Sequence, residues 1–207
     1  MTDSHAESEQ DSKPEPTGRT IVDPNTGETL TFVETAAEGS DDQVVMLLEL
    51  APGTLIPRHA HPYEEIFELV DGDCEVWLDG QWNRLVAGVP VTAALDHVHG
   101  VRNQAADTAA IVKVVGTPGA VVEYGLRIKF LLSRDGYLPV PGKRPGHLLL
   151  NAVVLDRCGL YFPPLPRWLF KLLITPLAAI GRWRGREKFL LAEYPEYGRM
   201  LDALKAA

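Results

Sequence analysis

Short runs of alternating apolar and polar residues follow one another from Arg19 to Gly116, separated by clusters of glycine, proline, aspartate and asparagine. Alternation with a period of two is typical of β-strands, and turn residues at such close intervals are typical of hairpins. We expect strands within residues 20–35, 42–50, 64–72, 73–80, 81–88, 89–95, 99–103 and 108–116. No amphipathic helix is expected in this part of the chain, so the pattern predicts a mainly β domain, built as a sandwich or a small barrel.

The pattern changes to helical spacing after residue 117. Val122, Leu126 and Phe130 recur at intervals of four residues, as they do along the apolar side of an α-helix. Helices are expected within residues 120–136, 144–159, 165–183 and 194–207. The sequence therefore predicts a β domain over residues 19–117 and a helical extension over residues 118–207.

The segment 165–183 is rich in leucine and tryptophan, which raises the question of a membrane helix. Arg167, Lys171 and Arg182 interrupt it and Pro176 lies inside it, so the uncharged stretch is too short to span a bilayer. The basic residues share one side of a helix, which predicts an amphipathic helix. Its apolar side can pack within the protein, on a second copy of the chain, or on lipid at a membrane interface. We favour packing on protein and keep the membrane surface as the alternative.

The first 18 residues are acidic and lack an apolar core, so we expect a disordered acidic tail rather than a signal peptide. The formal net charge of the chain is −8, which argues against nucleic acid as a partner because phosphate binding requires a basic surface. Cys74 and Cys158 stand far apart and predict neither a disulfide framework nor a CxxC zinc site. Together these features predict a cytoplasmic globular protein.

Two histidines, His59 and His61, stand one residue apart in the stretch GTLIPRHAHPYEEIFELVDG, and Glu65 follows closely. Residues i and i+2 of a strand point to the same face of a sheet, so we expect the two imidazoles to project together. Farther along, the stretch HVHGVRN supplies His99 on a strand that can lie beside the first pair. Imidazoles and a carboxylate are the residue types that bind divalent first-row metal ions and leave open coordination positions.

The spacing of these residues resembles the two signatures of the cupin superfamily. The residues similar to the first signature are Gly53, His59, His61, Glu65 and Gly72, and those similar to the second are Gly88, His99 and Asn103. The family usually has proline and glycine where this chain has Ala94 and Asp96, although aspartate tolerates the left-handed backbone of a turn. The resemblance covers Gly53 to Asn103 and implies a small cupin-type, jelly-roll-like β-barrel over residues 19–117, followed by the α-helical extension.

The resemblance also implies the ligands of one divalent transition metal ion, which could be iron, manganese, zinc, nickel or copper. These ligands would be His59, His61, Glu65 and His99. His97 precedes His99 by two residues, so strand alternation would turn it to the same face. It could donate a hydrogen bond to a ligand or act as a base, and as a base it is our candidate catalytic residue, although we favour a hydrogen-bonded residue of the wall.

Two functions stay open at this point. The first, slightly favoured, is an enzyme of the oxygenase or isomerase type that acts on a small molecule at a metal inside the barrel. The second is a non-catalytic protein that binds or senses a small ligand, held at the inner face of a membrane by the helix near 165–183. A homodimer is expected in either case, because apolar faces outside a small barrel need covering.

Overall fold

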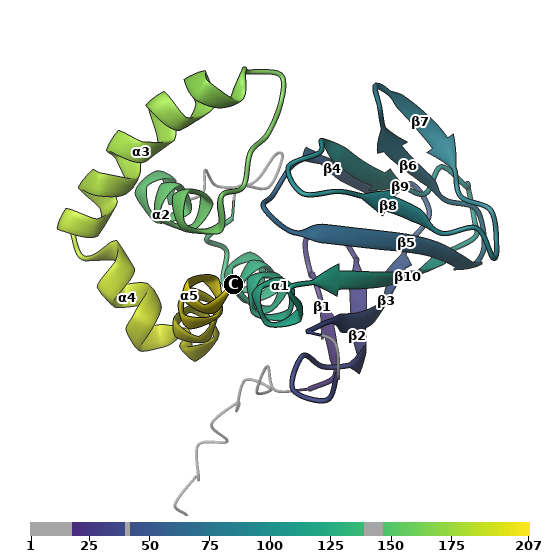
Figure 1. The fold of residues 1–207 in the computed structure, drawn as a ribbon, viewed down its shortest axis with the longest axis horizontal. Helices are drawn as coiled ribbons and strands as arrows, with labels where there is room; N and C mark the ends of the chain where they lie inside the picture. The colour runs from purple at the N-terminus through teal and green to yellow at the C-terminus, as the bar shows by residue number, and fades with distance from the viewer. Residues whose placement is uncertain (1–17, 40–41, 139–146) are drawn as a thin grey trace, which may run out of the picture.

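The computed structural model describes residues 18–39, 42–138 and 147–207, and its strands precede its helices along the chain (Figure 1). The described strands are β1 (Thr20–Val22), β2 (Thr29–Glu34), β3 (Val44–Leu50), β4 (Leu55–His59), β5 (Glu64–Asp71), β6 (Glu75–Leu78), β7 (Gln81–Arg84), β8 (Val91–Ala93), β9 (His99–Arg102) and β10 (Ala110–Thr117). The described helices are α1 (Gly119–Arg134), α2 (Leu148–Cys158), α3 (Arg167–Trp183), α4 (Arg186–Glu193) and α5 (Pro195–Ala206).

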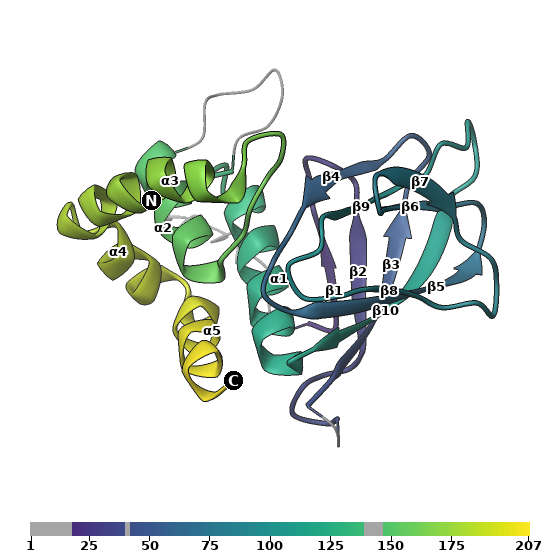
Figure 2. The same ribbon diagram turned by 45° about the horizontal axis from the view of Figure 1, so that its top comes forward.

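The strands form two antiparallel sheets that face each other (Figure 2). One sheet has the strand order β1-β2-β3-β10-β5-β8, and the other has the order β4-β9-β6-β7. Both sheets contribute to one hydrophobic core, for example through Phe32 and Met46 of the first sheet and Val76 and Val101 of the second. No pairing joins the two sheets among the described strands. The mainly β domain is therefore confirmed, whereas its closure into a barrel stays a prediction.

The turn between β6 and β7 shows how the sequence sets the strand register. Asp79 and Gly80 both have positive φ angles, 51° and 85°, and Leu78 pairs with Gln81 across the turn. Positive φ at both central residues is the geometry of a type I′ turn, whose twist matches that of the flanking strands. The Asp-Gly pair thus forms the tight turn that the sequence predicts.

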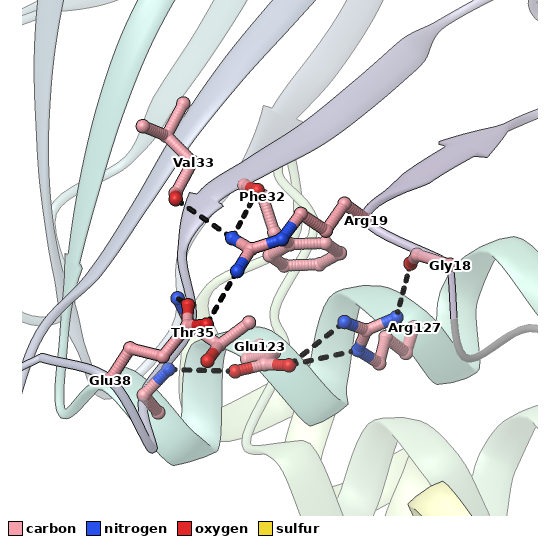
Figure 3. Close-up of polar contacts among 9 residues, drawn as sticks. Gly18, Arg19, Phe32, Val33, Thr35, Glu38, Glu123 and Arg127 are labelled. Carbon is pink, nitrogen blue, oxygen red and sulfur yellow. Dashed lines mark hydrogen bonds and ion pairs between the residues drawn. The ribbon is translucent and has the colours of Figure 1, made fainter.

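Helix α1 is attached to the first sheet by a buried polar cluster (Figure 3). Glu123 and Arg127, one helical turn apart, form an ion pair with 2.9 Å between Arg127 Nη2 and Glu123 Oε1. The other carboxylate oxygen of Glu123 accepts a hydrogen bond of 2.9 Å from the backbone N–H of Ala36, and the Arg127 guanidinium lies 4.1 Å from the ring centroid of Phe32. A buried charge is tolerated when it is paired and hydrogen-bonded, so this cluster fixes the helix at the end of β2.

The helices enclose a second hydrophobic core beside the sheets (Figure 1). Its most deeply buried members include Ile128 and Leu132 of α1, Leu150 and Val153 of α2, Ala178 of α3, Leu190 of α4, and Tyr197 and Met200 of α5. Helices are present in all four segments where the sequence predicts them, and α4 is an addition. With only eight residues, α4 is too short for a periodic pattern to be recognised in its sequence.

Two predictions about the ends of the chain have different outcomes. The acidic tail predicted for residues 1–18 lies almost wholly outside the described residues. The amphipathic helix predicted near 165–183 is present as α3, but Trp168, Leu172 and Ile180 on its apolar side are exposed to solvent. None of the described helices combines the length and the hydrophobicity that crossing a membrane requires.

Candidate metal centre

The side chains of His59 and His61 converge, although His61 lies beyond the end of the strand that contains His59. Strand β4 ends at His59, and Ala60 then pairs with Tyr161 in an antiparallel bridge, with hydrogen bonds of 2.9 Å in both directions. This bridge keeps the backbone extended as far as His61, so the two side chains still point to the same side. Their ring centroids lie 5.3 Å apart.

His99 joins this pair from β9, the neighbour of β4 in the second sheet. His59 and His99 are directly paired in the sheet register, and their ring centroids lie 4.5 Å apart. The His99 ring is 4.6 Å from that of His61. One nitrogen atom from each of the three imidazoles lies within 4.8 Å of the other two, close enough to bind a single metal ion. The predicted convergence of three imidazoles is therefore confirmed.

Each of the three rings is oriented by a backbone carbonyl two residues away. The Nδ1 atoms of His59, His61 and His99 lie 2.8, 3.0 and 3.0 Å from the carbonyl oxygens of Pro57, Tyr63 and His97, respectively. A carbonyl oxygen only accepts hydrogen bonds, so each Nδ1 donates and carries the ring proton. In the neutral imidazole the Nε2 atom then holds a free lone pair, which is the form that binds a metal.

Glu65 of β5 faces the histidines from the other sheet. Its Oε2 atom lies 3.3 Å from Nε2 of His61 and 3.2 Å from Nε2 of His99. The side chain is buried. Burial by itself would raise the pKa of Glu65, but the polar contacts with His61 and His99 hold it below its ordinary value. Glu65 is thus a carboxylate at neutral pH, and it adds a negative charge to the cluster.

The same surroundings act differently on two of the imidazoles. Burial, followed by repulsion from the neighbouring rings of His99 and His61, lowers the pKa of His59 to about 3. Burial also acts to lower the pKa of His99, but the contact with Glu65 outweighs it and raises that pKa. His59 is therefore neutral across the physiological range, whereas His99 holds a proton more readily when no cation is bound.

The Nε2 atoms of His61 and His99 and the carboxylate of Glu65 are arranged to bind a cation rather than to hydrogen-bond with one another. The Nε2 atoms of His61 and His99 are buried and make no hydrogen bond of acceptable geometry, despite their short distances to Glu65. A carboxylate accepts hydrogen bonds only, and the Nδ1 contacts leave both Nε2 atoms as acceptors as well. Buried acceptors that face one another are unfavourable unless a proton or a metal ion lies between them. This donor set of nitrogen and oxygen atoms therefore suits a divalent transition metal.

Aromatic side chains surround the histidines on several sides. Tyr63 stacks on His61 with 3.5 Å between ring centroids, and Phe67 lies 5.9 Å from His99. Phe162, from the connection between α2 and α3, lies 6.1 Å from His59. Nothing in the sequence pointed to Phe162, because no spacing rule links residue 162 to a strand a hundred residues earlier. The bridge between Ala60 and Tyr161 brings it there.

His97 lies apart from this arrangement. It precedes β9, in a turn where its backbone N–H donates to the carbonyl of Ala94 at 3.0 Å, and its side chain is exposed. Strand alternation therefore does not apply to it, which removes the geometric reason for placing it beside the ligands. The preceding residue, Asp96, has a φ of 63°, so aspartate does adopt the left-handed turn conformation here.

Two facing antiparallel sheets with three convergent imidazoles define a β-sandwich protein with a candidate metal centre. Residues 46–115 match the family model described as the cupin domain, and this part of the chain is a cupin domain. It contains His59, His61, Glu65 and His99. Among curated proteins, no sequence matches the chain.

Several solved structures resemble part of the chain. The DMSP lyase DddQ from Ruegeria pomeroyi DSS-3 is 28% identical, with 37% of this chain and 39% of that chain covered and a TM-score of 0.34. The polyketide cyclase RemF from Streptomyces resistomycificus is 18% identical over 48% of this chain and 73% of its own, with a TM-score of 0.42. KdgF from Halomonas sp. is 23% identical over 47% of this chain and 84% of its own, with a TM-score of 0.41. The similarity to the lyase thus spans well under half of that protein.

Proposed function

We propose that this protein is a metal-dependent cupin that acts on a small molecule at a divalent transition metal ion held by His59, His61, His99 and Glu65. One observation carries the proposal above the others. Three imidazoles are oriented through Nδ1 by backbone carbonyls, and their remaining nitrogens gather next to a buried carboxylate. The sheets that carry them would then form the small jelly-roll-like barrel that the cupin signatures imply.

The protein's own residues give the site three properties. The carbonyl contacts hold the rings in the metal-binding tautomer, and Glu65 offsets part of the charge of a bound cation. Tyr63, Phe67 and Phe162 supply an apolar wall that limits access of water. A divalent ion with open coordination positions would supply Lewis-acid or redox chemistry in this setting.

An enzyme of the oxygenase or isomerase type remains the favoured interpretation. The described side chains in ring or polar contact with the histidines include Glu65 and three aromatic residues, Tyr63, Phe67 and Phe162. Burial raises the pKa of Tyr63, so this residue stays a neutral phenol. The reactive group of such an enzyme would therefore be the metal itself, and the aromatic wall would suit a substrate with an apolar or aromatic portion.

The same wall also supports a second candidate, which is a protein that captures a small ligand without converting it. Among the described residues in ring or polar contact with the cluster, the neutral phenol of Tyr63 is the one ionisable group beyond the four proposed ligands. A binding protein needs none, whereas many isomerases do. The exposed position of His97 favours this candidate over any mechanism that relies on His97 as a base.

Elemental analysis of full-length protein purified without chelators tests the metal centre. We expect about one equivalent of iron, manganese, zinc, nickel or copper per chain, as for a site with a single set of ligands. His61→Ala and His99→Ala should each abolish stoichiometric metal. Glu65→Gln should weaken metal affinity at least about tenfold, because it replaces a charged carboxylate ligand by a neutral amide.

His97→Gln is the matched control, since it changes a neighbouring histidine that is exposed. It should retain the metal content of the wild type and the same circular dichroism spectrum. A folded wild-type protein that takes up none of the five metals would refute the proposal. Turnover of a panel of small molecules, followed by oxygen uptake and by product analysis, then distinguishes the enzyme from the binding protein.

A further inference from the structure

Helix α3 carries an exposed apolar surface that the rest of the described chain does not cover. Trp168, Leu172, Leu173, Ile180 and Trp183 are 68, 62, 51, 44 and 82% exposed. At 3.6 residues per turn these five side chains fall within less than half of the helix circumference. We call this set the outer face of α3. Such a concentration of large apolar side chains on one surface marks an interaction site.

The opposite side of the same helix explains why the outer face is free. Ala178 and Gly181 are the buried residues of α3, and a Cβ atom added at Gly181 would lie 2.6 Å from the carbonyl oxygen of Leu149 in α2. The helix therefore packs on α2 through its small residues. Figure 1 shows α3 at the outer edge of the helical group. Its largest apolar side chains are exposed.

Cationic side chains flank the outer face, and the helix has no acidic residue. Lys171 and Arg184 lie on either side of the apolar arc, and Arg186 and Lys188 follow directly in α4. All four are exposed, and none forms an ion pair within the described residues. By contrast, three other basic residues of α2 and α3 form ion pairs: Arg157 with Glu187, Arg167 with Asp96, and Arg182 with Asp156.

Charge decides between two possible occupants of this face. If a second copy docked there around a twofold axis, two acid-free helices would lie together and Lys171 and Arg184 would face like charges. A membrane surface with anionic headgroups instead offers hydrocarbon to the leucines and negative charge to the rim. Trp168 and Trp183 lie near the two ends of the helix, an arrangement that is also typical of a helix in the interfacial region.

We propose that the outer face of α3 binds the protein peripherally to an anionic lipid bilayer, with the helix axis parallel to the membrane plane. The helix would insert its leucines and tryptophans to the depth of the headgroup boundary without crossing the bilayer. The inference does not depend on the metal centre, because His59, His61, Glu65 and His99 all lie in the β domain. A metal-free variant such as His99→Ala should bind lipid like the wild type.

Vesicle flotation of the full-length protein tests the proposal. The protein should float with vesicles in which about a third of the lipid is phosphatidylglycerol, and not with pure phosphatidylcholine. Raising the salt to about 0.5 M should weaken binding, because exposed charges are then screened within a few ångströms. In brominated vesicles the tryptophan fluorescence should be quenched, and Trp168→Phe combined with Trp183→Phe should remove that quenching.

Two double variants separate the apolar and the electrostatic contributions. Leu172→Ser with Leu173→Ser, and Lys171→Glu with Arg184→Glu, should each lower the affinity for anionic vesicles by at least about tenfold. Leu148→Ser and Arg199→Glu are the matched controls, since both residues are exposed on other helices, and both variants should bind like the wild type. All four variants change only exposed side chains, so the thermal unfolding midpoint of each should stay within a few degrees of the wild-type value.

Three results would overturn the proposal. The first is absence of the wild type from the floated fraction with anionic vesicles. The second is flotation that persists unchanged in both double variants. The third is a dimer in analytical ultracentrifugation that the Leu172→Ser, Leu173→Ser variant converts to a monomer, in a protein that binds no vesicles. That result would assign the outer face to a second copy of the chain.

Discussion

Gly53 and Gly72 both have left-handed backbone, with φ angles of 75° and 80°, but their surroundings differ. A Cβ atom at Gly72 would lie 2.4 Å from the carbonyl oxygen of Ala109, whereas one at Gly53 would meet no atom within 4 Å. We therefore expect Gly53→Ala to cost about 1 kcal/mol from backbone strain alone. Gly72→Ala should cost about 3 kcal/mol or more, because backbone must also move. Urea denaturation of both variants measures the difference, and equal losses would contradict it.

At the same scale, the sequence predicted the histidines better than their surroundings. The spacing of His59 and His61 is preserved by any extended backbone, so their convergence followed from local geometry alone. The position of His97 did not follow from local geometry, because β9 begins at His99 and the alternation of a strand does not extend back to His97. Phe162 depends on how a distant connection folds back onto Ala60, which local periodicity does not encode.

Among the elements, α3 is held at its first turn by an ion pair to the turn before β9. Arg167 Nη2 lies 2.6 Å from Asp96 Oδ1. The hydrogen bond from Arg167 is the largest influence on the pKa of Asp96 and lowers it below the ordinary value of 3.8. A carboxyl group whose pKa is lower in the folded state stabilises that state above its unfolded pKa. This contribution is lost as the pH falls through the folded pKa.

Asp96→Asn should therefore remove a stabilisation that depends on pH. Asparagine tolerates the left-handed backbone at this position as aspartate does, so the variant isolates the charge. In chelator-treated protein, we expect the variant to unfold at lower urea concentration than the wild type between about pH 7 and about pH 5. The two should converge as the pH falls below the ordinary pKa of aspartate. A difference that is constant down to about pH 3 would exclude the ion pair as its cause.

The strands and long helices were predictable because their burial follows the period of each element. In strand β2 the residues from Thr29 to Phe32 alternate between polar and apolar, and the structure has them alternately half-buried and buried. The outer face of α3 marks the limit of this reasoning. The sequence of α3 shows that the helix is amphipathic. Only the fold shows that α3 packs through its small residues and leaves its large apolar side chains exposed.

For the whole molecule, α1 connects the two hydrophobic cores. Val122 and Phe130 of this helix belong to the core between the sheets, and Ile128 and Leu132 belong to the core among the helices. Neither core is complete without α1. The β domain and the helical extension that the sequence separates at residue 118 are thus packed against opposite sides of one helix.

We therefore expect the protein to unfold in a single cooperative transition. Leu132→Ala, at a fully buried position in the helical core, should lower the free energy of unfolding by about 2–5 kcal/mol. The midpoint of unfolding should shift by the same amount whether it is followed by the helical circular dichroism signal or by the fluorescence of Trp77 and Trp82, which lie in β6 and β7. To isolate that fluorescence, Trp168 and Trp183 are replaced by phenylalanine in both proteins. Transitions that separate between the two probes would show instead that the halves unfold independently.

The carbonyl contacts of the three histidine rings have a consequence for how the proposed site would acquire a metal ion. The backbone carbonyls of Pro57, Tyr63 and His97 orient the three imidazoles, so the candidate site has its geometry before any metal ion binds. Binding of a metal to the proposed site would then require no refolding, and a set of nitrogen and oxygen donors such as this one would follow the common affinity order of the divalent metals. The supply of each element in the cell during synthesis would thus decide which one is installed, and with it the chemistry that the protein performs.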